Sequence, residues 1–332
     1  MCEFIAASEL QHQINIAASH RSPFVFAIDY NQAEGLFINH PLTESTIQWR
    51  VPQATNYKDK VEKDLNAPHP VLFKPHPEAK EIYAKRFEIV MNQLKKGNSF
   101  LTNLTVKTPL DMNLTLQQIF AFSDSPYALY IPNKFVCFSP EIFVRIDQHG
   151  RISSYPMKGT IDATLPHASQ TILQDKKESA EHYTIVDLIR NDLSCIATQV
   201  HVDRLRYIDT LHTSRNQLLQ VSSEISGQLP EDYLNRLGDI LFRLLPAGSI
   251  TGAPKCSTQQ IIDQAEQQSR GYYTGIFGYF DGQTLDTAVM IRFIEQEKNG
   301  SYFFRSGGGI TAKSDMNLEY EEVIQKIYLP FN

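Results

Sequence analysis

The sequence contains few cysteines, and none stands in a pattern that binds metal. Cys2, Cys137, Cys195 and Cys256 are far apart, and no Cys-x-x-Cys pair or nearby histidine gives the spacing of a zinc site. The separations also give no sign of a disulfide framework. We therefore expect reduced thiols that are mostly buried.

Long apolar runs and an excess of positive charge are also missing. No segment approaches the roughly 18 apolar residues that a membrane-spanning helix needs, and the N-terminus has no basic start followed by an apolar core. The 31 Lys and Arg residues against 37 Asp and Glu residues leave a formal net charge of -6, which does not attract a phosphate backbone. We expect a cytoplasmic protein with neither a nucleic acid nor a membrane as partner.

The chain is long enough for two domains of ~150 residues or for one large unit. Hydrophobic residues make up 42% of its 332 positions and charged residues 20%, which is typical of a globular protein. Four prolines fall between positions 68 and 77, where they mark a connection rather than a helix or central strand. We predict a short β-rich N-terminal subdomain over residues 1–77 and a larger domain over residues 78–332.

The expected elements follow the order strands, helix, several strands, final helix. This order indicates an α+β fold with large antiparallel sheets rather than a βαβ winding. Apolar residues at helical spacing precede Gly97, which is a suitable residue after a helix end. Further helices are expected at 178–197 and 318–328, and strands at 135–146, 151–156, 273–280, 286–295 and 302–306.

Two of the expected helices each carry a pair of glutamates three residues apart. Glu178 and Glu181 would share one face of the first helix, and Glu319 and Glu322 one face of the second. Two such pairs could hold Mg²⁺, which prefers hard oxygen ligands. Spacing alone leaves open the alternative that both pairs lie on solvated faces.

The segment LLPAGSITGAPK is a candidate for binding an anion. Thr251 and Gly252 precede an expected helix with Pro254 at its first position, where free backbone amides favour negative charge. Lys255 does not follow a glycine directly, so the segment is not a phosphate loop.

Gly307, Gly308 and Gly309 follow an expected strand directly. Because they lack Cβ atoms, their amides could approach an oxyanion closely, although a turn or bulge is the alternative. Arg292 lies in the apolar run TAVMIRFI, and a guanidinium there requires a carboxylate, which it can bind bidentately. That carboxylate could belong to a ligand or to this chain.

The segment SSYPMKGTIDA contains a single lysine, Lys158, between a β-rich run and a Gly-Thr turn. Taken alone, it could be a surface lysine at the end of a strand. Its neighbours Tyr155, Pro156 and Met157 are residues that proteins often bury, which leaves a functional role open.

The chain resembles one family in seven segments that occur in family order. These are SPEIF, MKGTIDA, SAEHYTIVDLIRNDL, PAGSITGAPK, GIFGYFDG, TAVMIRF and SGGGITAKSDMNLEYEEVIQK. They are similar to the chorismate-utilising enzymes: the large subunits of anthranilate synthase and aminodeoxychorismate synthase, together with isochorismate and salicylate synthases. The resemblance implies a chorismate-binding catalytic domain over residues 78–332, in which large antiparallel sheets pack as a sandwich with flanking helices.

The resemblance also implies roles for the candidate residues. Mg²⁺ would be the cofactor, with Glu181 and Glu322 as principal ligands and Glu178 and Glu319 supporting through water. The metal would hold the ring carboxylate of chorismate. The implied substrate-binding groups are Lys326 near that carboxylate, Arg292 and the amides of Gly307, Gly308 and Gly309 at the enolpyruvyl carboxylate, and Thr251 and Gly252 beside the ring.

Lys158 distinguishes branches of this family. Anthranilate synthases resemble one another in having alanine at this position, whereas aminodeoxychorismate synthases carry a lysine thought to attack ring C2 while the C4 hydroxyl leaves. Burial beside a cation such as Arg292 would favour the free amine that this attack needs. Glu141 of SPEIF matches the general acid of the family, which would protonate the departing hydroxyl.

Two further positions favour the same branch. Leu101 stands where isochorismate and salicylate synthases carry a lysine that activates water, and leucine cannot abstract a proton. Gln220 stands where anthranilate synthases usually carry a histidine, which removes one candidate for the elimination that aromatises the ring. We therefore expect ammonia, rather than water, as the second substrate.

The sequence thus predicts aminodeoxychorismate synthase component I, which converts chorismate and ammonia to 4-amino-4-deoxychorismate for p-aminobenzoate and folate synthesis. No cysteine lies in the Gly-x-Cys-x-Gly setting of a glutamine amidotransferase, so a separate glutamine amidotransferase subunit is the expected source of ammonia. Anthranilate synthase component I is the alternative among enzymes. A non-catalytic, chorismate-binding regulatory subunit is the alternative from another class.

Overall fold

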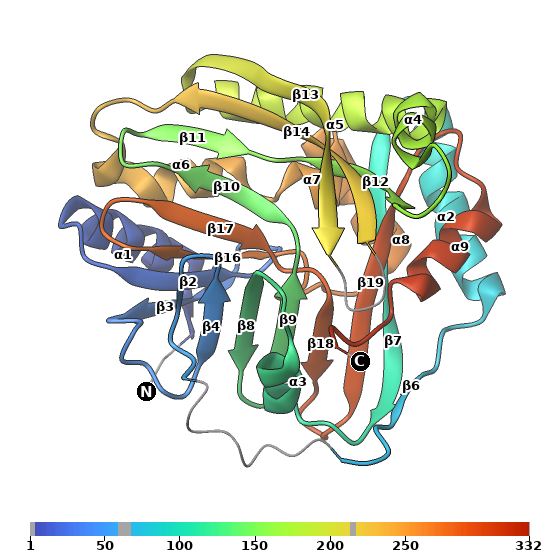
Figure 1. Ribbon diagram of the computed structural model, residues 1–332, viewed down its shortest axis with the longest axis horizontal. Coiled ribbons are helices and arrows are strands. Elements are labelled where there is room, and N and C mark those ends of the chain that lie inside the picture. Colours follow the sequence, from blue (N-terminus) through green and yellow to red (C-terminus); the bar gives the residue numbers. More distant parts are fainter. Residues whose placement is uncertain (1–3, 59–67, 213–216, 332) are drawn as a thin grey trace.

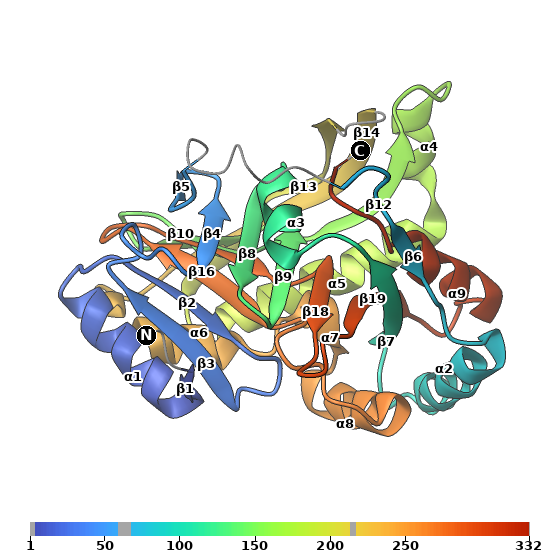
Figure 2. The same cartoon turned by 90° about the horizontal axis from the view of Figure 1, so that it is seen from below.

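Two large antiparallel sheets form the frame of the protein, with helices around them (Figure 1 and Figure 2). The computed structural model describes residues 4–58, 68–212 and 217–331. Within these residues one sheet has ten strands in the order β1-β3-β2-β16-β17-β10-β11-β14-β12, with β13 also on β14, and the other has nine in the order β15-β7-β19-β18-β9-β8-β4-β5, with β6 also on β7. The predicted α+β architecture of large antiparallel sheets with flanking helices is therefore confirmed.

The elements have the following bounds. The ten-stranded sheet consists of β1 (Phe4–Ala6), β2 (Phe24–Ile28), β3 (Glu34–Asn39), β10 (Ile142–Ile146), β11 (Arg151–Ser154), β12 (Met157–Asp162), β13 (Thr198–His212), β14 (Gln217–Gln228), β16 (Ile276–Phe280) and β17 (Leu285–Val289). The nine-stranded sheet consists of β4 (Gln48–Val51), β5 (Ala54–Thr55), β6 (Phe73–Pro75), β7 (Leu101–Met112), β8 (Tyr127–Ile131), β9 (Phe135–Ser139), β15 (Gly252–Ala253), β18 (Phe293–Gln296) and β19 (Tyr302–Ile310). The helices are α1 (Ala7–Ser19), α2 (Lys80–Lys95), α3 (Leu116–Phe122), α4 (Ala168–Gln174), α5 (Lys176–Ser194), α6 (Leu237–Leu244), α7 (Gly248–Thr251), α8 (Lys255–Glu266) and α9 (Met316–Gln325), with a 3₁₀ turn at Tyr233–Arg236.

Strand β2 is apolar throughout because both of its faces are buried. All five of its residues are buried, and because successive side chains of a strand point to opposite faces, they enter two different cores. Phe24 and Phe26 pack in the core that contains Leu10 of α1. Val25 packs in the core that contains Trp49 of β4. The ten-stranded sheet is thus covered by helices on one face and by the second sheet on the other.

Two chain segments that lie side by side in space pass from one sheet into the other. The expected strand 135–146 is divided into β9 and β10, and the expected strand 286–295 into β17 and β18, so each half belongs to a different sheet. The two crossings are tied together, because Val289 N donates to Glu141 O at 3.1 Å and Phe138 N donates to Arg292 O at 3.0 Å. Arg292 has a φ of 51° at its crossing, a left-handed conformation that is uncommon outside glycine. The prediction that Arg292 lies inside a strand was therefore wrong.

The N-terminal strands are part of the same two sheets. β2 pairs with β16, and β4 pairs with β8, so the first 77 residues do not form a sheet of their own. The predicted boundary between residues 77 and 78 therefore does not coincide with a break between sheets. No helix in the described part of the chain has the length and apolar character needed to span a membrane.

Side-chain caps define the starts of the two glutamate-bearing helices. Asp175 caps α5 by accepting a hydrogen bond from Glu178 N at 2.8 Å, and Asp315 caps α9 by accepting from Asn317 N and Leu318 N. Both helices begin two residues earlier than expected and end three residues earlier. Pro254 is the N-cap of α8 rather than its first helical residue.

A buried ion pair connects α8 to β7 of the nine-stranded sheet. The Arg270 and Glu266 side chains are each 1% exposed, and two hydrogen bonds of 2.7 and 2.9 Å join them. Arg270 also donates to Asn103 O at 2.7 Å and to Ile250 O at 2.9 Å, while Glu266 accepts from Thr105 N at 2.8 Å. The pair therefore fixes β7 relative to α7.

Glu266→Gln tests this connection, because it keeps the side-chain shape and removes the buried negative charge. We expect the free energy of unfolding to fall by about 3–5 kcal/mol, the typical cost of breaking a buried ion pair. Urea unfolding measures the change. Asp232→Asn in the exposed pair with Arg236 is the matched control, with an expected loss of about 0–1 kcal/mol. Equal losses in the two variants would contradict the role of the buried pair.

Candidate active site

Three cationic side chains from distant parts of the chain lie around the carboxyl group of Glu141. Lys158 comes from β12, Lys326 follows α9, and Arg292 lies at the crossing between β17 and β18; all three are close enough to influence Glu141 electrostatically. The sequence-predicted catalytic pair Glu141 and Lys158 is thus brought together with two of the predicted substrate-binding cations. Such a site favours a ligand that carries more than one negative charge.

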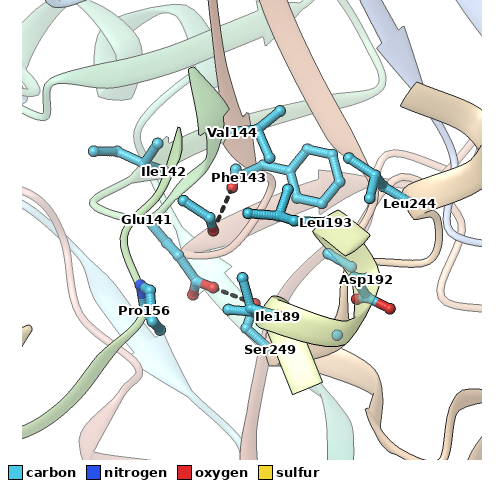
Figure 3. A pocket seen from close by; sticks show the side chains of 13 residues that line it. Glu141, Ile142, Phe143, Val144, Pro156, Ile189, Asp192, Leu193, Leu244 and Ser249 are labelled. Atoms are coloured by element: carbon cyan, nitrogen blue, oxygen red, sulfur yellow. Dashed lines mark hydrogen bonds between the residues drawn. The ribbon is translucent and has the colours of Figure 1, made fainter. Parts of the chain in front are cut away.

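Glu141 lies at the crossing between β9 and β10, and its backbone is held on both sides. Its N–H donates to Ser139 Oγ at 3.1 Å, and its carbonyl accepts from Val289. Its carboxylate accepts a hydrogen bond from Ser249 of α7 (Figure 3). Burial raises the pKa of Glu141, against the opposing effects of Ser249 and the three cations. A carboxyl group with a raised pKa can remain protonated closer to neutral pH, as a general acid must.

Lys158 lies at an irregularity in β12. The register against β14 shifts between Lys158 and Thr160, and Gly159 has a φ of 76°, which is the backbone of a bulge. The bulge re-aims the side chain, which is 23% exposed and has Nζ 3.4 Å from Glu181 Oε2. The charged group in contact with Lys158 is therefore an anion, whereas the sequence led us to expect a neighbouring cation such as Arg292.

The three glycines lie inside β19, not after a strand as predicted. β7 pairs with β19 along Gly307, Gly308 and Gly309, but β18 pairs with it only as far as Arg305, so one side of the glycine segment has no strand beside it. Gly307 O accepts from Lys326 Nζ at 2.8 Å on that side. In an antiparallel strand the N–H and C=O of one residue point the same way. The N–H groups of Gly307 and Gly309 therefore face the open side, as an anion-binding role requires.

Two of the four glutamates lie close to these glycines, and the other two lie close to β12. A Cβ on Gly308 would lie 3.5 Å from Glu322 Oε1 and 3.6 Å from Glu319 Oε2, both on α9. On the α5 side, Glu181 contacts Lys158, whose Nζ would lie 3.3 Å from a Cβ on Gly309. Glu178 Oε2 lies similarly close to Gly159. Among the described residues, no three carboxylate, imidazole or thiol groups are gathered in the geometry of a metal site.

Arg292 remains available to bind a ligand carboxylate. Its Nη1 donates to Lys326 O at 3.2 Å, and its guanidinium lies 4.8 Å from the ring centre of Tyr328. No carboxylate among the residues that the structure describes forms an ion pair with it, so the alternative of an internal salt bridge is not observed here. Its Nε is buried and has no hydrogen-bond partner within the same residues.

Thr251 and Gly252 lie where α7 meets β15. Gly252 has a φ of 119°, and a Cβ on it would come within 1.8 Å of Leu101 O, so only glycine fits. Thr251 is fully buried. Leu101, the position that distinguishes family branches, is close to the glycines, with Cδ1 3.1 Å from the place of a Gly309 Cβ.

Sequence reasoning missed two side chains at this site. Ser249 lies in PAGSITGAPK and His182 in SAEHYTIVDLIRNDL, yet neither was assigned a role. His182 is 1% exposed, and its Nε2 is 2.6 Å from Ser223 Oγ on β14. Burial, with Arg206 and Lys158 nearby, lowers the pKa of His182 to about 4, so the ring is neutral near pH 7. It links the helix that carries Glu181 to the strand beside Lys158, and only its place in a motif could have indicated this.

Curated relatives share this sequence to different extents. An uncharacterised PabA-like protein of Haemophilus influenzae is 49% identical over 98% of this chain and 98% of its own length. Anthranilate synthase component 1 of a Synechocystis species is 30% identical over 82% of this chain and 53% of its own. Aminodeoxychorismate synthase of Streptomyces griseus is 33% identical over 74% of this chain and 35% of its own.

The fold and the family are established by two further comparisons. The solved structure of anthranilate synthase component I from Streptococcus pneumoniae matches with a TM-score of 0.67 at 21% identity, over 92% of this chain and 79% of that one. It shares the arrangement of large antiparallel sheets and flanking helices. The sequence model described as chorismate binding enzyme matches residues 10–331. The chain therefore belongs to the family of chorismate binding enzymes.

Proposed function

We propose that this protein is an aminodeoxychorismate synthase component I, which converts chorismate and ammonia to 4-amino-4-deoxychorismate for p-aminobenzoate and folate synthesis. The observation that carries the proposal is the position of Lys158: a bulge directs its amine toward Gly309, in the electrostatic neighbourhood of the partly buried Glu141. A nucleophile and a proton donor at one anion-binding site suit displacement of a ring hydroxyl.

The cations and amides suit chorismate as the substrate. Chorismate carries two carboxylates, and a planar guanidinium such as Arg292 can bind one of them bidentately. The N–H groups of Gly307 and Gly309 lie on the open side of β19, where Lys326 also contacts the strand. Burial lowers the pKa of Lys326. The Glu322 carboxylate, whose Oε1 is 2.6 Å from Lys326 Nζ, opposes this shift. These groups would hold the carboxylates while the ring faces Lys158.

The proposed reaction has two displacement steps. The free amine of Lys158 forms a bond to ring C2, the ring double bonds shift, and the C4–O bond breaks as Glu141 gives its proton to the leaving hydroxyl, which departs as water. Ammonia then bonds to C4, the C2–N electron pair returns to Lys158, and the Glu141 carboxylate takes one proton from the new amino group. The sum is chorismate plus ammonia to aminodeoxychorismate plus water, with the enzyme unchanged.

Leu101 supports ammonia over water as the nucleophile. It is 2% exposed and lies beside Gly309, so an apolar side chain stands near the reacting centre where a water-activating lysine would be needed. The ammonia would come from a glutamine amidotransferase subunit, because none of the cysteines stands in an amidotransferase motif. Among the described cysteines, Cys137 is buried in β9 whereas Cys195 and Cys256 are exposed, so the expectation of mostly buried thiols was wrong.

Mg²⁺ is the cofactor in this proposal, and the four glutamates offer the type of ligand atom that this ion prefers. Four glutamates on two helices could supply hard carboxylate oxygens: Glu319 and Glu322 lie close to Gly308, and Glu178 and Glu181 lie close to β12. Glu181 and Glu322 would be the principal ligands, with Glu178 and Glu319 supporting through water. When bound, the ion would provide positive charge for the ring carboxylate of chorismate.

Product analysis tests the function. The pure protein, incubated with chorismate, Mg²⁺ and ammonium, is expected to form aminodeoxychorismate, identified by chromatography. Pyruvate release with anthranilate fluorescence, in the absence of any lyase, would instead support anthranilate synthase component I. Binding of chorismate without turnover would support the non-catalytic subunit.

Lys158→Ala should lower aminodeoxychorismate formation by orders of magnitude, because direct attack by dilute ammonia would replace the two-step route. Chorismate binding should persist, since Arg292 and the glycine amides do not depend on this side chain. Lys313→Ala, at an exposed lysine outside the site, is the control and should behave as the native protein. A Lys158→Ala variant with near-native product formation would reduce this lysine to a positioning charge.

The metal assignment is tested by titrating Mg²⁺ into the protein in a calorimeter, without chorismate. Glu181→Gln and Glu322→Gln each remove one negative charge, and we expect each to weaken binding by about 10-fold or more. Glu321→Gln is the matched control, since Glu321 lies on α9 next to Glu322, is exposed as Glu322 is, and has no assigned role. Native-like binding in both variants would show that these glutamates do not hold the metal.

A further inference from the structure

The carboxylate of Glu141 accepts a hydrogen bond from Ser249 in a cavity with mostly apolar walls. Figure 3 shows the carboxylate directed at Ser249, whose hydroxyl donates a hydrogen bond to Oε1. The remaining walls include Ile142, Leu193 and Leu244. An apolar wall cannot replace a lost hydrogen bond, so the Ser249 contact decides how the carboxyl group is oriented and solvated.

Ser249 is itself held in place by tight packing of α7 against α5. A Cβ on the preceding residue, Gly248, would lie 2.7 Å from Leu188 Cδ2, so the absence of a side chain there brings the two helices together. Lys255, shortly after α7 in the chain, forms an ion pair with Asp192 of α5 at 2.7 Å and donates to Leu244 O at the same distance. The hydroxyl is therefore presented to Glu141 by a rigid element.

We propose that Ser249 is a positioning residue for Glu141: its hydroxyl fixes the direction of the carboxyl group and stabilises the carboxylate left when the proton is given away. This inference depends on the proposed function only for the identity of the reaction. The contact between Ser249 and Glu141 would have the same effect in any reaction in which Glu141 transfers a proton.

The charged groups around Glu141 set the direction of the effect. Lys158 on β12, Lys326 after α9 and Arg292 at the β17–β18 crossing favour the carboxylate, as Ser249 does. Asp192 of α5 lines the same cavity, but its charge is paired with Lys255. Since burial raises the pKa of Glu141 and Ser249 opposes this rise, Ser249→Ala should raise the pKa further, and the proton should be retained to higher pH.

Infrared difference spectroscopy of the intact protein tests this without turnover. The band of the protonated Glu141 carboxyl group, identified by its loss in Glu141→Gln, is followed as the pH rises. In Ser249→Ala its midpoint should move upward by about one pH unit, the size expected when one hydrogen bond to a charged group is lost. Ser249→Thr restores a hydroxyl and should titrate as the native protein does.

Ser154→Ala is the matched control, since Ser154 lines the same cavity but donates to Phe143 O at 2.9 Å. We expect no shift of the Glu141 band in this variant. An unchanged midpoint in Ser249→Ala, or an equal shift in Ser154→Ala, would overturn the proposal. A native protein that makes a product other than aminodeoxychorismate would reject the proposed function but leave this titration unaffected.

Turnover gives a second readout. Ser249→Ala should lower kcat about 10-fold, in line with one hydrogen bond to a charged group, while the KM for chorismate changes little because Ser249 holds the acid rather than the carboxylates of the substrate. Ser249→Thr should recover most of kcat. Equal losses of kcat in the alanine and threonine variants would indicate that Ser249 only fills space.

Discussion

The crossing of two paired strand segments between the sheets is the constraint on which the active site depends. The backbone hydrogen bonds Val289 N to Glu141 O and Phe138 N to Arg292 O tie these crossings together. Each crossing interrupts a strand, and the interruption directs one polar side chain into the site. If these strands continued without interruption, the side chains of Glu141 and Arg292 would alternate with those of buried neighbours between the two faces of a sheet. The change of sheet thus places both the proposed general acid and the cation proposed to bind a carboxylate.

The charges of the site oppose the effect of burial. Burial raises the pKa of Glu141, while the three cations and the serine hydroxyl oppose that rise. The net result is a raised pKa. The same cations suit a doubly negative substrate, so the groups that favour binding also tend to ionise the acid. The apolar walls on one side of Glu141 oppose this tendency, whereas the hydroxyl of Ser249 adds to it. Substrate binding and acid catalysis therefore place competing demands on the same few side chains.

Sequence reasoning predicted the architecture, because helix ends, glutamate spacing and motifs are local features. It also named Glu141, Lys158, Arg292 and Lys326, which the structure brings near one another, while their roles stay predictions. It did not predict that single apolar runs would divide between two sheets, since the division at Glu141 and Arg292 depends on pairing with distant strands. For the same reason Gly307 to Gly309 were expected after a strand, whereas they continue β19 beyond the end of β18. The roles of Ser249 and His182 also depend on partners more than 40 positions away.

The most direct test of the central claim is a search for the covalent adduct on Lys158. Native enzyme is mixed with chorismate and Mg²⁺ without ammonia, quenched with acid, and examined by intact-protein mass spectrometry followed by peptide mapping. The account predicts a mass increase equal to chorismate less one water, located on Lys158 and discharged when ammonium is added before the quench. Product formation by an enzyme that never carries this adduct, or an adduct on another residue, would contradict it.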